Sequence, residues 1–277
     1  MSDAVLATKH GKLALIAPAL ATVGYRVRAV DVDTDTLGTF SGEVERQGPP
    51  RDVAVAKARL GMAVTGVGVG LASEGTVGPS PHVPFATADT ELVVLVDDRR
   101  GLVVVGRHVS HELRVVGEDV APGDPLDTLI ERAGVGGADG HHLIVRPAAG
   151  ARRPVVKEVG DVGALAEAVA RCAAASDDGR ARVETDLRAH RCPSRRPAIA
   201  AAAQDLATRL AASCPACGLP GWGPVRSVGG RPCADCGAPT DAPRADVEGC
   251  VACPEERERP RADAGPVDPA RCGWCNP

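Results

Sequence analysis

The residue pattern with the clearest chemistry is a set of four Cys-x-x-Cys pairs near the C-terminal end of the chain. Eight of the ten cysteines belong to these pairs, which all lie in the last 64 residues. The pairs are Cys214/Cys217, Cys233/Cys236, Cys250/Cys253 and Cys272/Cys275. Two thiolates in one tight turn can bind a tetrahedral ion, and a second turn completes its four ligands. The spacing therefore predicts two structural zinc ions, and the alternative is a disulfide-rich secreted tail.

The order of the pairs favours zinc ions shared by neighbouring turns. Between the first two pairs lie 15 residues and between the last two lie 18, and both spacings suit a zinc ribbon. Neighbouring turns also close the shorter loops. We expect the first pair to join the second and the third to join the fourth, although the spacing also permits interleaving. Cys172 and Cys192 stand alone, and we expect them to be buried or incidental thiols rather than ligands.

Zinc thiolates favour a reducing compartment, so we expect a cytoplasmic protein. An apolar run at 13–23 follows Lys9 and Lys12 and imitates a signal peptide. Pro18 lies inside this run, which also has the pattern of a helix in a strand–loop–helix unit. We expect it to belong to the fold. No stretch has the roughly 20 consecutive apolar residues that a membrane-spanning helix needs.

A candidate phosphate-binding turn lies near the N-terminus, between an expected strand at 4–8 and the helix that follows. It contains Thr8, His10 and Lys12. Backbone N–H groups and the positive end of a helix attract anions at such a turn, and Lys12 adds a compact charge. The alternative is an ordinary solvated lysine.

Two further candidates are Lys57 and Glu74. The chain has only four lysines among its 32 basic residues, so a lysine is the exception in this sequence. Glu74 follows an expected strand at 67–72, where an α/β sheet commonly binds ligands, and it could act as a Mg²⁺ ligand or general base. Further carboxylates could contribute, namely Asp33, Asp35, Glu43 and Glu91. The alternatives are a surface lysine and a solvated loop carboxylate.

An arginine-rich segment precedes the cysteine pairs. Its arginines are Arg180, Arg182, Arg188, Arg191, Arg195 and Arg196, against the acids Glu184 and Asp186. The patch could hold a phosphate or a base, with Arg188 as a candidate ligand residue, or it could form salt bridges with the acidic tail.

The elements that must position these residues alternate between strands and helices, which predicts an α/β fold with a mixed sheet flanked by helices. We expect helices at 51–62, 125–133, 162–175 and 196–212, and a hairpin that joins strands 92–96 and 102–105. An α/β domain at 1–212 would include the last of these helices as a linker, and a double zinc ribbon would occupy 213–277.

Composition sets limits on the partners. The net charge is −4 and the sequence pI about 6.0, which disfavours DNA and an anionic membrane surface. Only five residues are aromatic, so the core must consist mainly of Val, Leu, Ala and Ile.

Nearly the whole chain resembles a bacterial family known as a domain of unknown function. The segments that carry this resemblance are 7–12, 33–35, 38–43, 72–79, 184–188 and the four cysteine pairs. The resemblance implies no particular activity.

The N-terminal part resembles, more distantly, the inosine-triphosphate pyrophosphatase and Maf-like superfamily. Thr8-x-His10 is similar to the phosphate loop of those enzymes, with His10 in the place of their Asn and Lys12 one residue early. Thr39-Phe40 and Ala54-x-x-Lys57-Ala58 are similar to their next motif, split here by an insertion. Further matches in the same order are Ser73-Glu74-Gly75 and Ala189-His190-Arg191.

This second resemblance implies a metal-dependent nucleoside-triphosphate pyrophosphatase. Mg²⁺ on Glu74, with Glu43, would position water against the α-phosphorus while Lys12 and Lys57 neutralise the triphosphate. The alternative is a non-catalytic module that binds nucleotide or protein and docks through the zinc ribbons.

Overall fold

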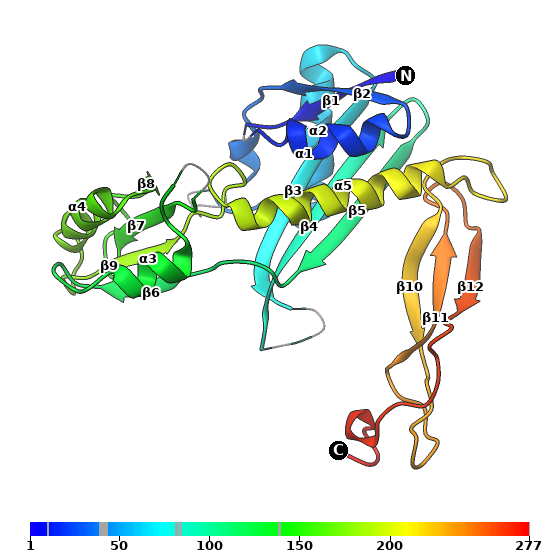
Figure 1. Cartoon of the computed structure of the whole chain (residues 1–277). Helices are drawn as coiled ribbons and strands as arrows, with labels where there is room; N and C mark the ends of the chain where they lie inside the picture. Colours follow the sequence, from blue (N-terminus) through cyan, green and yellow to red (C-terminus); the bar gives the residue numbers. More distant parts are fainter. Residues whose placement is uncertain (10, 39–43, 81–82, 84, 138–139, 277) are drawn as a thin grey trace.

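The structure of the chain is a computed structural model that describes residues 1–9, 11–38, 44–80, 83, 85–137 and 140–276. It contains three sheets, which we name sheet A, sheet B and sheet C in chain order. Sheets A and B carry helices and form the body of the molecule, whereas sheet C forms an arm that extends from the end of the last long helix (Figure 1). The predicted mixed α/β architecture is confirmed.

Sheet A has the strand order β2-β1-β3-β4-β5. Its strands are β1 (Ser2–Ala7), β2 (Tyr25–Val30), β3 (Val69–Pro79), β4 (Thr87–Asp97) and β5 (Leu102–Ser110). Strand β1 runs parallel to both of its neighbours, and the β3-β4-β5 meander is antiparallel, so the sheet is mixed.

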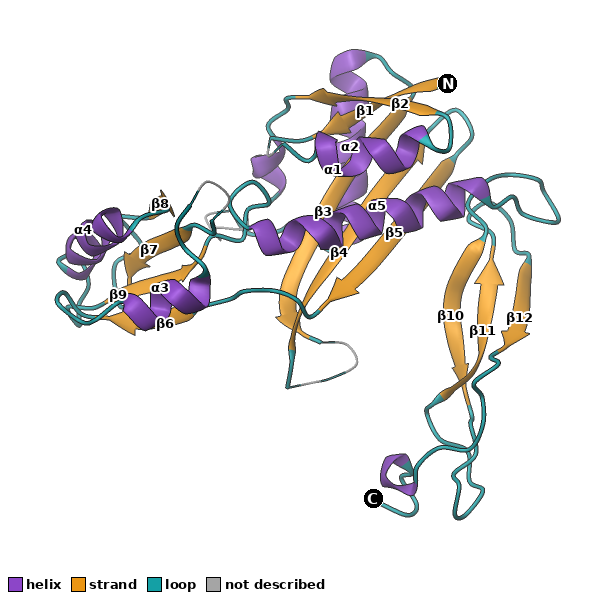
Figure 2. Cartoon of the chain, viewed as in Figure 1, coloured by secondary structure: helices purple, strands orange, loops and turns teal. Residues whose placement is uncertain are grey.

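Helices cover both faces of sheet A (Figure 2). The helices α1 (Leu13–Ala21) and α5 (Arg196–Ala211) pack on one face, and α2 (Pro50–Thr65) packs on the other. Small residues let these helices approach closely: a Cβ on Gly106 of β5 would lie 2.2 Å from the backbone nitrogen of Leu206 in α5. The first core therefore consists of small and aliphatic side chains, as the shortage of aromatics predicts.

Strand β3 is longer than its sequence suggests. The expected strand ends at Ala72, with Ser73, Glu74 and Gly75 in a loop, but β3 continues to Pro79. The reason is the ladder with β4, in which these three residues pair with Val93, Leu92 and Glu91. Glu74 therefore belongs to a rigid strand and not to a loop.

Sheet B is inserted between β5 and α5. It has the order β6-β9-β7-β8 and is antiparallel throughout its pairs. Its elements are β6 (Gly117–Val120), α3 (Asp127–Ala133), β7 (Leu143–Pro147), β8 (Val156–Val159), α4 (Val162–Ala173) and β9 (Ala181–Thr185). Both helices contribute to a second hydrophobic core that is separate from the core of sheet A. Residues 1–212 thus contain three hydrophobic clusters, one on each face of sheet A and one in sheet B.

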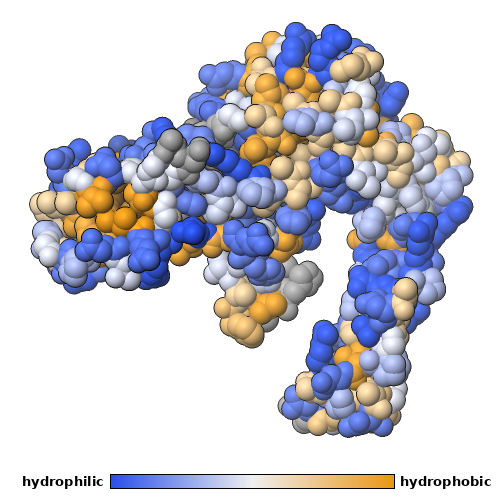
Figure 3. Space-filling view, in the orientation of Figure 1, coloured by the Kyte–Doolittle hydropathy of each residue, from blue (hydrophilic) through white to orange (hydrophobic). Residues whose placement is uncertain are grey.

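The arm follows α5 and consists of sheet C and the turns at its two ends. Its strands are β10 (Gly223–Gly229), β11 (Pro243–Gly249) and β12 (Glu256–Pro260). They form an antiparallel meander with little buried surface, and every residue of β12 is exposed. Charged and polar residues cover much of the strands' surface (Figure 3). Among the described residues, no helix has the length and apolar character to cross a membrane.

Candidate functional site

The eight paired cysteines gather into two clusters of four. In each cluster the four Sγ atoms lie within 4.8 Å of one another. The cross-pair Sγ–Sγ distances are 3.6–3.8 Å. A tetrahedral zinc ion with Zn–S bonds of about 2.3 Å requires sulfurs about 3.8 Å apart, whereas a disulfide requires about 2.05 Å. The donor set and its geometry therefore fit zinc, and no described cysteine forms a disulfide.

The expected pairing of neighbouring turns is wrong. Cys214/Cys217 lie with Cys250/Cys253, and Cys233/Cys236 lie with Cys272/Cys275. The antiparallel meander of sheet C is the reason, because each strand runs in the opposite direction to the strand before it. The first and third turns therefore meet at the end near α5, and the second and fourth meet at the far end, the tip of the arm (Figure 1).

The thiols of the tip cluster have divergent acidities without metal. Backbone hydrogen bonds from Cys275 and Trp274 lower the pKa of Cys272 to about 7. Contacts with Cys236 and Cys233 raise the pKa of Cys275 to about 12. Four thiols at this distance cannot all ionise to thiolates without a cation between them. The remaining cysteines, Cys172 and Cys192, are buried outside both clusters, as expected.

A second candidate site lies on sheet A, where the three residues Ser73, Glu74 and Gly75 each meet a different cation. Lys12 Nζ donates a hydrogen bond to Ser73 Oγ at 2.8 Å. Lys57 Nζ forms an ion pair with Glu74 Oε1. The guanidinium of Arg195 lies directly over Gly75. The motif Ser73-Glu74-Gly75 is therefore a meeting point for three basic side chains.

The two lysines reach this motif from opposite faces of the sheet. Leu71 contributes to the core under α1 and α5, and Ala72 to the core under α2. Because side chains alternate along a strand, Ser73 shares the face of Leu71, and Glu74 shares the face of Ala72. The groups still act on one another: burial lowers the pKa of Lys12, and the charges of Glu74 and Lys57 contribute in opposite directions.

On the α5 face, two buried carboxylates accompany Lys12. Asp89 and Glu91 lie two residues apart on β4 and are almost completely buried. Arg195, also fully buried, pairs with Glu91 and places its Nε 3.6 Å from Asp89 Oδ1. Burial and the charge of Glu91 raise the pKa of Asp89 to about 7, although Arg195 opposes this shift. Both oxygens of Asp89 and Oε2 of Glu91 have no hydrogen-bond partner among the described residues.

Gly75 has a steric role in this arrangement. A Cβ at position 75 would lie 2.0 Å from Nη2 of Arg195 and 2.8 Å from both carboxylate oxygens of Glu91. Only glycine leaves room for the guanidinium over β3. On the α2 face, Arg46 completes the site, because its Nη2 lies 3.5 Å from Glu74 Oε2 and donates to the carbonyl of Gly75 at 2.6 Å.

The structure thus brings Lys12, Lys57 and Glu74 to one short segment of β3. Thr8 directly follows β1, before the turn that leads to Lys12. His10 and Glu43, predicted to bind the ligand, lie outside the described residues. Of the carboxylates named with Glu74, Glu91 joins the site, whereas Asp33 pairs with Lys9 at 2.6 Å.

The arginine-rich segment does not form one patch. Arg188 pairs with Asp186 at 2.5 Å and lies 3.3 Å from Glu158 on β8, so it belongs to a separate ion-pair group. Arg191 joins this group through Glu158. Arg182 pairs with Asp119 and Arg195 enters the buried site. Arg180 likewise lies 3.9 Å from Asp124, so these arginines pair with acids of the body.

Asp89, Arg46 and the buried position of Arg195 were not predicted from the sequence. For Asp89 a signal existed: Asp89, Glu91, Val93 and Leu95 occupy alternate positions of one strand, so the two acids continue a buried face. Nothing local marks Arg195, which meets a partner 104 residues away.

Comparison with known families shows the protein family to which the chain belongs. The family described as Domain of unknown function (DUF6671) matches residues 57–277. The chain belongs to the DUF6671 family. The matched region of this DUF6671 protein includes Lys57, Glu74 and all eight clustered cysteines, whereas Lys12 precedes it. A comparison with curated proteins finds no match.

Proposed function

We propose that the body of this DUF6671 protein binds a nucleoside triphosphate and hydrolyses it as a metal-dependent pyrophosphatase. The observation that supports this proposal is the convergence of Lys12, Lys57 and Glu74 on adjacent residues of β3. It agrees with the order of the superfamily-like motifs in the sequence, whose phosphate turn and lysine helix supply the two lysines. The compartment proposed is the cytoplasm, where a reducing environment preserves zinc thiolates.

The roles proposed for the residues follow from charge and position. Lys12 and Lys57 would neutralise the phosphate chain, each from its own face at the end of parallel strand β1. Ser73 holds the ammonium of Lys12 in place at 2.8 Å. Arg46 and Lys57 hold Glu74, so this carboxylate is oriented before substrate arrives.

The carboxylates that best fit a hard divalent cation are Asp89 and Glu91. They offer three oxygens without a hydrogen-bond partner among the described residues, and one of these, Asp89 Oδ1, lies 3.6 Å from Arg195 Nε. Both oxygens of Glu74 take part in ion pairs, with Lys57 and Arg46. Mg²⁺ prefers such oxygens, and a bound divalent ion would activate water and stabilise charge on the phosphates. With a pKa of about 7, Asp89 can hold or release a proton near neutral pH.

The test is a screen of the purified protein against canonical and damaged nucleoside triphosphates with Mg²⁺ or Mn²⁺. Pyrophosphate release is the expected result, and Lys57→Met should lower the rate at least 100-fold because it would remove a charge that neutralises the phosphate chain and holds Glu74. Lys157→Met on β8 is the matched control and should keep the rate within twofold. No pyrophosphate release from any triphosphate would overturn the proposal.

A non-catalytic role is the second candidate, and the pairing of Glu74 favours it. A carboxylate held by both Lys57 and Arg46 is less available as a base. Nucleotide would then raise the melting temperature without turnover. In this alternative the arm docks a protein partner, for which Trp274 near the tip, 81% exposed, offers an apolar contact. Duplex DNA and membranes are not proposed as partners.

A further inference from the structure

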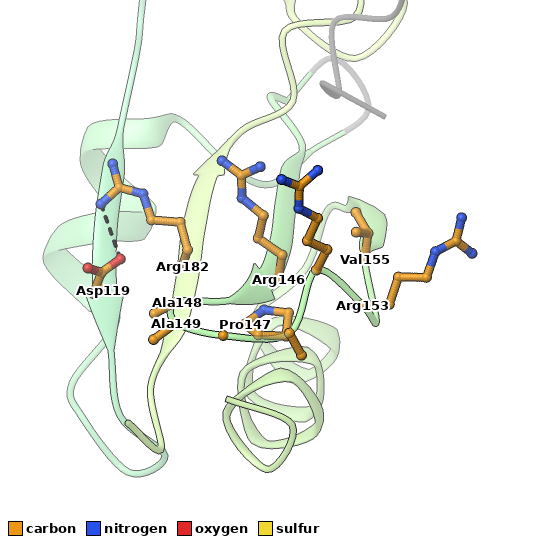
Figure 4. A pocket seen from close by; sticks show the side chains of 11 residues that line it. Asp119, Arg146, Pro147, Ala148, Ala149, Arg153, Val155 and Arg182 are labelled. Atoms are coloured by element: carbon orange, nitrogen blue, oxygen red, sulfur yellow. Dashed lines mark hydrogen bonds and ion pairs between the residues drawn. The ribbon is translucent and has the colours of Figure 1, made fainter. Parts of the chain in front are cut away.

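The outer face of sheet B carries an arginine-lined cavity that the proposed active site does not include. Val145 and Val183 point into the core beneath α3 and α4, so Arg146 and Arg182 point to the opposite face. The cavity has a volume of about 680 Å³, within the range of small-molecule sites. Figure 4 shows the guanidinium groups of Arg146 and Arg182 extending in the same direction from neighbouring strands.

The strand register places two like charges side by side. Arg146 of β7 lies directly opposite Arg182 of β9 in the antiparallel ladder. Like charges at directly opposite positions destabilise a sheet. Gly117 makes room for this arrangement, because a Cβ there would lie 2.8 Å from Nη2 of Arg182. The two guanidinium groups therefore lie on neighbouring positions, where one anion could bind both.

The carboxylates nearby do not balance the charge. Arg182 pairs with Asp119 at 3.2 Å and Arg146 with Glu184 at 2.9 Å. Four arginines and one carboxylate line the cavity, and with Glu184, which pairs with Arg146, the group keeps a formal excess of two positive charges. Arg152 and Arg153, on the loop between β7 and β8, are exposed and have no ion-pair partner among the described residues.

We propose that this cavity binds a phosphate-chain polyanion, and that it does so independently of the site on sheet A. Guanidinium groups match phosphate oxygens through paired hydrogen bonds, and four of them suit a ligand with three or more negative charges. None of the four aromatic residues that the structure describes lines the cavity, so they offer a base no ring to stack on. Inorganic tripolyphosphate and a nucleoside triphosphate should therefore bind with similar affinity.

The experiment uses the full-length zinc-loaded protein without added Mg²⁺, with tripolyphosphate as the probe. Titration calorimetry gives the affinity, and hydrogen exchange locates the ligand. We expect tripolyphosphate to slow exchange in residues 146–156. The variant Arg152→Ala/Arg153→Ala should bind tripolyphosphate at this segment at least tenfold more weakly. The matched control is Arg28→Ala/Arg171→Ala, which removes two exposed arginines outside the cavity and should change the affinity less than twofold.

Further measurements identify the source of the anion and separate the two sites. Equal affinity for a nucleoside triphosphate supports recognition of the phosphate chain, whereas a strong preference for nucleotide, citrate or single-stranded RNA would overturn it. The proposal would also be overturned if tripolyphosphate left the exchange of residues 146–156 unchanged, or if the double variant bound tripolyphosphate at this segment with wild-type affinity. Lys57→Met should abolish hydrolysis but keep the protection at 146–156, so failure of one proposal does not imply failure of the other.

Discussion

Sheet A and sheet C are stabilised in different ways. Both faces of sheet A lie beneath helices, and aliphatic and alanine side chains fill the two interfaces. Sheet C has no covering helix among the described residues, and its buried strand residues are two glycines, Ala245 and Val247. Four-cysteine clusters lie at both of its ends. Packing holds the first sheet, and metal is expected to hold the second.

The difference determines what each region can do. A packed sheet can keep charged groups in fixed positions away from water, and sheet A does so with Arg195, Glu91 and Asp89. An arm without a core of its own cannot exclude water around a reacting group, but it can present an extended surface. The chemistry is therefore expected on the body, and the arm is expected to dock.

The largest expected effect is that of metal removal. A strong zinc chelator should unfold the arm, because few apolar contacts remain to replace the free energy of metal binding, about 10 kcal/mol or more per structural site. Hydrogen exchange should show loss of protection in residues 223–260 and normal protection in β1–β5. Two zinc ions per chain should be released. Simultaneous unfolding of sheet A would contradict the separation between the regions.

The next effect concerns the two clusters of the arm. Cys250→Ser should lower the zinc content from two ions per chain to one and expose Cys214, Cys217 and Cys253 to alkylation. Cys233 and Cys236 should stay protected in the tip cluster. Cys236→Ser is the matched control and should give the complementary pattern. If Cys250→Ser instead exposed Cys272 and Cys275, neighbouring turns would share the metal.

Within sheet A, Gly75→Ala tests the packing of a charged group. The added methyl would lie 2.0 Å from the guanidinium of Arg195, which is fully buried and cannot move away freely. We expect a loss of about 2–4 kcal/mol in the free energy of unfolding, measured in urea. Gly78→Ala, on the same strand with no atom within 4 Å of its Cβ, should change it by less than about 0.5 kcal/mol.

The last effect is a pH dependence. The pKa of Asp89 is raised from 3.8 to about 7, so its proton stabilises the folded state below pH 4 and this contribution disappears as the pH rises to 7. Asp89→Asn should remove this dependence. Relative to wild type, the variant should gain about 4 kcal/mol of stability between pH 4 and pH 8. Asp98→Asn, an exposed control, should follow the wild-type slope, and a parallel slope for Asp89→Asn would refute the assignment.

Much of the fold could be predicted from local patterns. The hairpin of β4 and β5 and the helices α2, α4 and α5 agree with apolar periodicity and turn residues. The extension of β3 and the short strand β8 were not predicted. In both cases the segment is a strand because a partner strand supplies its hydrogen bonds, and the local sequence does not show which partner that is.

The candidate site shows the same limit. Lys12, Lys57 and Glu74 were identifiable because a lysine is rare in this chain and an acid after an apolar strand is unusual. The site's other members depend on contacts across long separations, such as that between Glu91 and Arg195. No local pattern could place a buried arginine over Gly75.

The sequence by itself determined the metal chemistry, because a Cys-x-x-Cys turn needs only four consecutive residues to present two thiolates. It also determined the composition of the core, since five aromatic residues leave only aliphatic side chains to fill it. Tertiary structure alone decided which turns share an ion and which face each lysine approaches. Both outcomes depend on strand direction and side-chain alternation, and these are fixed only when strands distant in the sequence pair with one another.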